Sequence, residues 1–351
     1  MSGQNQLAFP GVPVESNVEW VWTEDPLEEP VVPTFVHTTV MAAEVLEALS
    51  PRVGGLYLDA TLGGGGHTKA ILDAAPGVRV VALDRDRVAL HAARERLESY
   101  GDRVLFVKSP FGRVREALAE HGITRVDGLC ADLGVSSPQL DEAQRGMSFR
   151  REGPIDMRMD QESGETALGL IERLSDDELA DMIFKYGEER RSRRIARSIK
   201  RALADRELLS TLDLRRAIVR AVGPARVGGV DPATRTFQAL RIAVNQELDE
   251  LEALLASLPH VLLPGGVAAL LSFHSLEDRL VKRAFQSGPF SPLFKKPRVA
   301  TEEECAANAR SRSAKLRAAH HQATRSGASY ETSEGEAPGA EAEKDAPEEP
   351  S

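Results

Sequence analysis

Short apolar runs alternate with amphipathic segments over the first part of the chain, and this alternation restricts the fold more than any other feature. Four such runs lie at 56–59, 78–83, 104–107 and 126–131, and the segment 85–100 shows the apolar spacing of a helix. Strands that alternate with helices in this way are joined by right-handed crossovers into a parallel sheet with helices on both faces. We therefore expect an α/β fold.

The alternation stops after the fourth run. From 141 to 235 the sequence is charged and helical in pattern, and it continues with a long predicted helix at 237–258 and a strand at 267–272. The pattern predicts a sheet domain split into residues 34–140 and 236–325. Residues 141–235 would form an α-helical insertion after the fourth strand.

The two ends of the chain differ from this body in composition. Residues 1–33 hold six acidic residues and no lysine or arginine, and residues 330–351 hold eight acidic residues and one lysine. They carry −6 and −7 of a formal net charge of −10, which leaves about +3 for the body. We expect a flexible acidic extension at 1–33 and a disordered acidic tail at 326–351. The body is therefore not too acidic to bind a nucleic acid.

Cysteine usage and hydropathy indicate a cytoplasmic protein. The two cysteines, Cys130 and Cys305, form no CxxC pair, so neither a metal site nor a disulfide framework is expected. Arg52 is the first basic residue, so the charged start of a secretory signal is missing. No run of 18 apolar residues occurs, and we expect no membrane span.

A run of four glycines, Gly63 to Gly66, lies between the first strand and its helix. Glycines let the backbone turn tightly and approach a ligand closely, and the start of the next helix offers free N–H groups. Asp59, Asp84 and Asp132 end strands one, two and four, where parallel sheets bind their ligands. These features predict a nucleotide-like cofactor.

Two cofactor classes fit this loop. A dinucleotide fold requires GxGxxG, and Thr68 stands here where the third glycine is needed. A methyltransferase that uses S-adenosylmethionine needs a looser turn, because it seats no pyrophosphate. Asp84 does not discriminate, since the acid after strand two holds ribose hydroxyls in both classes. The pattern favours S-adenosylmethionine and leaves a nicotinamide-dependent oxidoreductase as the alternative.

Five longer motifs carry a family resemblance. They are 131–140 (ADLGVSSPQL), 153–160 (GPIDMRMD), 186–190 (YGEER), 232–238 (PATRTFQ) and 272–279 (SFHSLEDR). With these motifs the chain resembles the bacterial RsmH (MraW) family from about His37 to Arg317. The resemblance implies a Rossmann-like class I methyltransferase fold. It also implies S-adenosylmethionine-dependent methylation of the exocyclic N4 amine of a decoding-region cytidine in 16S ribosomal RNA.

The resemblance further implies a set of site residues. The expected cofactor contacts are Gly65, Gly66, His67, Asp84, Phe111, Asp132 and Gln139. Phe111 would form an apolar wall against adenine. Many amino-methyltransferases carry an Asp/Asn-Pro-Pro-aromatic motif after strand four, where this chain has Asp132-Leu-Gly-Val. We expect Asp132 to hold the amine as well as the cofactor, and therefore to be catalytic.

A basic stretch within the expected insertion suggests how RNA would bind. Residues 185–226 hold thirteen lysines and arginines against five acidic residues, a net charge of +8. Between 190 and 201 helical spacing places Ile195 and Ile199 on one face and basic residues on the others. Together with the family resemblance, this basic stretch favours phosphate contacts with 16S rRNA or the small ribosomal subunit. The alternative is a helix face that is simply exposed to solvent. A non-catalytic RNA-binding protein is a third interpretation, and no pattern indicates the oligomeric state.

Overall fold

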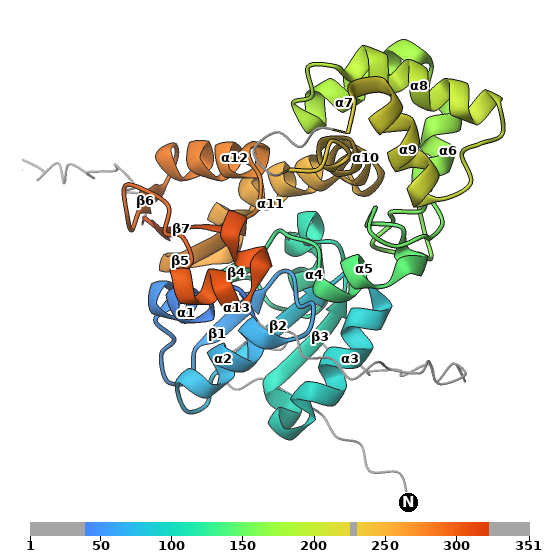
Figure 1. Ribbon diagram of the computed structural model, residues 1–351. Coiled ribbons are helices and arrows are strands. Elements are labelled where there is room, and N and C mark those ends of the chain that lie inside the picture. The colour runs from blue at the N-terminus through green and yellow to red at the C-terminus, as the bar shows by residue number, and fades with distance from the viewer. Residues whose placement is uncertain (1–38, 225–229, 323–351) are drawn as a thin grey trace, which may run out of the picture.

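The computed structural model describes residues 39–224 and 230–322, which include both the sheet domain and the helical insertion (Figure 1). The predicted flexible ends, 1–33 and 326–351, lie outside the described residues. Within those residues, no helix is both long enough and apolar enough to cross a bilayer.

A seven-stranded sheet forms the centre of the larger unit, in the order β3-β2-β1-β4-β5-β7-β6. The strands are β1 (Leu56–Asp59), β2 (Arg79–Asp84), β3 (Val104–Lys108), β4 (Val126–Asp132), β5 (Leu262–Ser272), β6 (Phe290–Pro292) and β7 (Lys315–His321). The first five pair in parallel, and β7 runs antiparallel to β5 and β6. The predicted α/β fold with a parallel-rich sheet is therefore confirmed.

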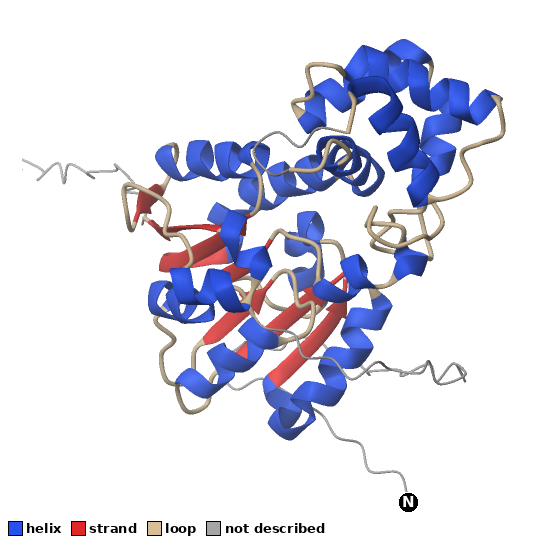
Figure 2. Cartoon of the chain, in the orientation of Figure 1, coloured by secondary structure: helices blue, strands red, loops and turns tan. Residues whose placement is uncertain are grey.

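Helices cover both faces of this sheet (Figure 2). One face packs against α1 (Ala42–Leu49), α2 (Gly66–Ala74) and α3 (Arg87–Leu97), and the other against α4 (Val114–Glu120), α11 (Glu247–Val261) and α12 (Ser275–Gln286). Adjacent strand residues point to opposite faces, so Tyr57 enters one apolar core and Leu58 the other. Cys130 is buried in the same core as Tyr57, as a small apolar residue.

A second unit follows β4; it begins within the predicted insertion and continues through α10 to Asn245, past the predicted end at 235. Its helices are α6 (Ala167–Arg173), α7 (Asp176–Gly187), α8 (Ser192–Ala204), α9 (Thr211–Val222) and α10 (Thr234–Asn245), gathered in the upper part of Figure 1. Their apolar faces share one core, which includes the predicted pair Ile195 and Ile199. A capping box between Ser175 and Glu178 fixes the start of α7.

The predicted single helix at 237–258 is wrong. The structure divides it into α10 and α11, because Gln246 adopts a left-handed conformation with φ 53°. Phe237 and Leu240 of α10 pack in the helical core, whereas Leu254 of α11 packs on the sheet. The break therefore lets one continuous apolar pattern serve two different cores.

Short elements complete the described part of the chain. They are η1 (Glu98–Arg103), η2 (Phe111–Arg113), α5 (Ser137–Asp141), η3 (Ala143–Arg145), α13 (Glu302–Ala307) and η4 (Ala309–Ser313). The chain moves outward from β1 to β3 and then returns to β4 on the other side of β1. This reversal places a crevice between the loops after β1 and β4, where ligands of such sheets bind.

Candidate active site

A cleft of about 850 Å³, counting its open mouth, lies at this reversal. It brings together Gly66, His67, Asp84, Phe111, Asp132 and Gln139, all of them predicted cofactor contacts. Gly65, the remaining predicted contact, does not line the cleft. Two residues that the sequence did not single out, Glu247 and Arg310, also line it.

The glycine run shapes the wall of the cleft under the start of α2. Gly65 immediately precedes the helix with φ 74°, a backbone conformation that favours glycine. A Cβ atom on Gly66 would come within 1.7 Å of Thr39 Oγ1, so no larger residue fits there without a shift. Because Gly63, Gly64 and Gly66 carry no side chain, their backbone lines the cleft at the positive end of a helix.

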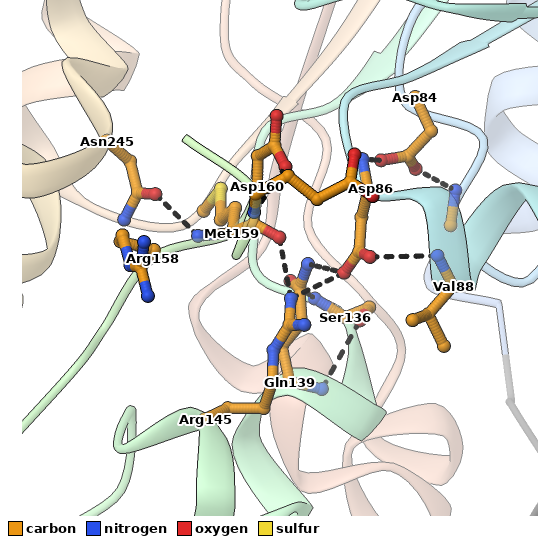
Figure 3. A network of polar contacts seen from close by, with 12 residues as sticks. Asp84, Asp86, Val88, Ser136, Gln139, Arg145, Arg158, Met159, Asp160 and Asn245 are labelled. Atoms are coloured by element: carbon orange, nitrogen blue, oxygen red, sulfur yellow. Dashed lines mark hydrogen bonds and ion pairs between the residues drawn. The ribbon is translucent and has the colours of Figure 1, made fainter. Parts of the chain in front are cut away.

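Asp84, at the end of β2, holds the opposite side of this loop (Figure 3). Its Oδ2 accepts a hydrogen bond from Gly63 N at 2.8 Å, and its Oδ1 accepts one from Asp86 N at 2.8 Å. Burial raises the pKa of Asp84 to about 6, although both hydrogen bonds act to lower it. The carboxylate is therefore ionised above this pH and oriented by the backbone before a ligand arrives.

Asp59, the third acid at a strand end, has a different place. Its side chain is buried and accepts hydrogen bonds from Thr68 Oγ1 at 2.7 Å and Thr61 N at 3.2 Å. It does not line the cleft. Asp59 therefore fixes the glycine loop to α2.

Asp132 ends β4 inside the cleft. Its Oδ1 accepts a hydrogen bond from Gly134 N at 3.2 Å, and its Oδ2 lies 3.9 Å from Nε2 of the buried His67 ring. Its backbone N–H donates to Thr61 Oγ1 at 2.6 Å, which joins the loops after β1 and β4. Burial raises the pKa of Asp132 to about 6, and the charge of Arg310 opposes that rise. The result is an oriented carboxylate with one oxygen beside an imidazole.

Asp86 and Arg145 form a buried link that the sequence did not reveal (Figure 3). Asp86 caps α3 at Val88 N, and its Oδ2 accepts hydrogen bonds from Gln139 Nε2 at 3.1 Å and from Arg145 Nη2 at 2.5 Å. Arg145 also donates to the Met159 carbonyl at 2.6 Å. In the sequence, the only signal for this link is the carboxylate of Asp86 itself, two residues after Asp84. It ties the loop before the helical unit to the strand that carries Asp84.

A second polar cluster adjoins the cleft through Glu247, where α11 and α12 begin. Arg241 donates to both carboxylate oxygens of Glu247, at 2.7 and 2.8 Å. Glu277 accepts from Phe273 N at 2.8 Å, and its Oε1 lies 3.1 Å from His274 Nε2. His274 caps α12, while Ser275 donates to Glu188 of the helical unit.

Three of these side chains are metal-ligand types. Ligand atoms of Glu247, His274 and Glu277 lie within 4.8 Å of one another. Both acids already accept hydrogen bonds from the protein, and the Arg241 guanidinium neutralises Glu247. The expectation that no metal is needed stays a prediction.

Comparison with known proteins shows which family the chain is similar to. Residues 34–322 match the MraW methylase family. A protein of Sorangium cellulosum named "Ribosomal RNA small subunit methyltransferase H" is 63% identical over 284 residues, covering 81% of this chain and 90% of that protein. A protein of the same name from Cyanothece sp. is 52% identical over 288 residues, covering 82% of this chain and 95% of that protein. Another from Prochlorococcus marinus is 53% identical over 291 residues, covering 81% of this chain and 92% of that protein.

These matches extend over both units of the structure and confirm the resemblance that the motifs carry. The nicotinamide-dependent alternative is therefore wrong. The chain belongs to the MraW methylase family and is a methyltransferase that uses S-adenosylmethionine.

Proposed function

We propose that this methyltransferase transfers the methyl group to the exocyclic N4 amine of a decoding-region cytidine in 16S ribosomal RNA. One observation supports this most: the Asp132 carboxylate ends β4 inside the cofactor cleft, with Oδ2 beside His67. The names of the relatives agree with a small-subunit RNA substrate. Such a substrate also agrees with the cytoplasmic location that the sequence predicts.

The cleft fits S-adenosylmethionine on three sides. The glycine loop presents bare backbone at the start of α2, Asp84 presents a carboxylate suited to two ribose hydroxyls, and Phe111 supplies an apolar wall. When bound, the cofactor supplies an electrophilic methyl group on a sulfonium. The remaining catalytic requirements fall on the protein's own residues.

The main requirement concerns the amine. The N4 lone pair of cytosine is delocalised into the ring, so the nitrogen needs an acceptor for its N–H that favours a reactive geometry. Asp132 supplies such an acceptor, and Gly134 holds its other oxygen in place. An amine held about 3 Å from the methyl carbon and in line with its bond gains rate by positioning alone.

The helical unit offers a surface for the RNA backbone. Arg194, Arg197 and Arg201 lie at helical spacing on α8, are exposed, and form no ion pair with any residue that the structure describes. Two other basic residues of α8 already interact with other parts of the protein. Arg193 pairs with acidic residues of α7, and Lys200 donates to carbonyls at the end of α6. We assign phosphate contacts to the first three, with the target base unpaired or extruded into the cleft.

The test is methyl transfer to small ribosomal subunits from a strain that lacks this modification. The purified protein and tritiated S-adenosylmethionine should place label in 16S rRNA, and nuclease digestion should release it as N4-methylcytidine. Subunits from the unmodified parent strain are the control and should accept almost none. Label in another nucleoside, or RNA binding without any transfer, would contradict the proposal.

A further inference from the structure

Arg310 lines the cleft although it lies far from the other site residues in the sequence. It belongs to η4, which leads into β7. The side chains around it hold this short segment in place. Asn308 Oδ1 accepts from Arg310 N at 3.2 Å, and Ser311 Oγ donates to the Asn308 carbonyl at 2.8 Å. Glu304 of the preceding α13 accepts from Met41 N at 2.8 Å and so fixes the segment to the sheet domain.

Arg310 and Asp132 line the same cleft, and other charged groups lie near the guanidinium. Burial lowers the pKa of its guanidinium, and the carboxylates of Asp132 and Asp141 raise it. Arg241, on α10 of the helical unit, lies close enough to lower it further. Arg310 therefore shares the cleft with Asp132 and lies within electrostatic reach of Asp132 and Arg241. The glycine loop and Asp84, which suit the cofactor, belong to other strand ends.

We propose that Arg310 and Asp132 together recognise the Watson–Crick edge of the target cytosine, with Arg310 donating to N3 and O2 while Asp132 accepts from the N4 amine. This assignment rests on the proposed function and names the residue that selects the base. The guanidinium has five N–H donors in a planar fork, so it can serve two base acceptors and keep a protein contact.

The same pair of side chains disfavours the other bases. Uracil would place O4 against the Asp132 carboxylate and its N3–H against the Arg310 donors, and guanine would place O6 against the carboxylate. Adenine matches the amine and one acceptor but has no second acceptor where cytosine has O2. A site built to hydrogen-bond one edge rejects an edge that leaves its buried polar groups unpaired.

A chemical double-mutant cycle tests this directly. The substrates are reconstituted small subunits whose 16S rRNA, assembled by ligation, carries cytidine or 3-deazacytidine at the position that the wild-type enzyme methylates. Single-turnover rates are measured for the wild type and for Arg310→Gln. We expect Arg310→Gln to lower the rate on cytidine by about 10- to 100-fold. The change to 3-deazacytidine, which removes the N3 acceptor, should then cost the variant much less than it costs the wild type.

Two controls separate this role from a structural one. Arg312→Gln changes an exposed arginine two residues away and should show the wild-type loss on 3-deazacytidine. The dissociation constant for S-adenosylmethionine should stay within about 2-fold of the wild type in Arg310→Gln. If that variant does not fold, Arg310→Lys, which keeps the charge but loses the fork, enters the same cycle.

Losses that simply multiply would overturn the assignment, and so would a selective loss of S-adenosylmethionine binding, which would place Arg310 on the cofactor. In either case the wild type still methylates cytidine, so the proposed function survives. If the wild type methylates no cytidine in either subunit, the proposed function itself fails, and this assignment fails with it.

Discussion

Two half-buried carboxylates, Asp84 and Asp132, dominate the chemistry of the cleft at the scale of single residues. Each has a pKa near 6 because burial disfavours its charge, and each is oriented by backbone N–H groups. A positively charged cofactor repays part of that desolvation, since its sulfonium binds better beside an ionised carboxylate. In the ligand-free protein the two ionised carboxylates are therefore disfavoured by desolvation, and binding of the cofactor offsets part of that cost.

This arrangement predicts opposite pH trends for binding and stability. As pH falls through about 6, Asp84 and Asp132 take up protons, so the affinity for S-adenosylmethionine should fall. Because their folded pKa values lie above the usual 3.8, protonation should instead raise the free energy of unfolding of the ligand-free protein. Their stabilising contribution is complete below pH 3.8 and is lost as pH rises through 6.

Calorimetric titration of S-adenosylmethionine between pH 5 and 8, together with urea unfolding over the same range, would measure both trends. The control is Asp84→Asn, which should flatten part of each profile. An affinity that stays constant down to pH 5 would contradict the assignment of ionised carboxylates to the site.

The residue scale also shows where the sequence reaches its limit. Asp59, Asp84 and Asp132 all end strands and look equivalent in the sequence, and their placement at one edge of the sheet was predictable. Which of them faces the cleft depends on side-chain direction, and only the structure shows that Thr68 turns Asp59 inward. Arg310 could not be predicted as a cleft residue for another reason. It enters the cleft from a segment far along the chain, and no local sequence pattern links that segment to the cleft.

At the scale of elements, the junction of α10 and α11 shows how tertiary structure overrides periodicity. The apolar pattern from 237 to 258 continues without a break, and Gln246 carries no turn signal in the sequence. The structure bends there because α10 joins the helical core and α11 joins the sheet. Strands β1 to β4 were predictable to within a residue, since their apolar runs are short and bounded. Strand β5 begins at Leu262 and not at the predicted 267, and β6 and β7 were not predicted.

The left-handed Gln246 gives a stability prediction. Its side chain is exposed, and a non-glycine residue in this conformation costs roughly 1 kcal/mol. Gln246→Gly should therefore raise the free energy of unfolding by up to about 1 kcal/mol. Gln246→Val should lower it, because a β-branched residue tolerates this conformation poorly. Urea unfolding of the two variants would measure the difference, and a more stable valine variant would contradict the described backbone.

The arginines of α8 predict a salt-dependent loss of RNA affinity. Changing Arg194, Arg197 and Arg201 to Gln should weaken binding to small-subunit RNA. It should also reduce the slope of log Kd against log salt by about 2, as expected for the loss of three phosphate contacts. Affinity for S-adenosylmethionine should not change. Filter binding at several salt concentrations would measure the slope.

The matched control removes the same total charge from the same unit. Arg173, Arg193 and Arg220 are exposed but pair with acidic residues, so their triple Gln variant should lose much less affinity. Equal losses in both variants would mean that only the overall charge matters, and α8 would then have no specific role.

At the scale of the whole molecule, the two units meet around the cleft. Asp86 and Arg145 join the cofactor side to the loop before the helical unit, and Arg85 donates to the Asn245 carbonyl at the end of α10 at 2.9 Å. Glu188, at the end of α7, accepts from Arg279 at 3.0 Å at the start of α12. The insertion was predictable from where the alternation stops. These contacts were not, because they join residues far apart in the chain.

This organisation places the cofactor loop and Asp132 in one cleft next to the helical unit. The central claim is that methyl transfer occurs at that carboxylate. Single-turnover transfer from saturating S-adenosylmethionine to undermethylated small subunits tests it most directly, comparing the wild type with Asp132→Asn. Glu116→Gln, an exposed change on α4, serves as the control. We predict that Asp132→Asn folds and lowers the transfer rate by about 100-fold or more, while the control keeps full activity. Full transfer by a folded, cofactor-saturated Asp132→Asn would contradict the claim.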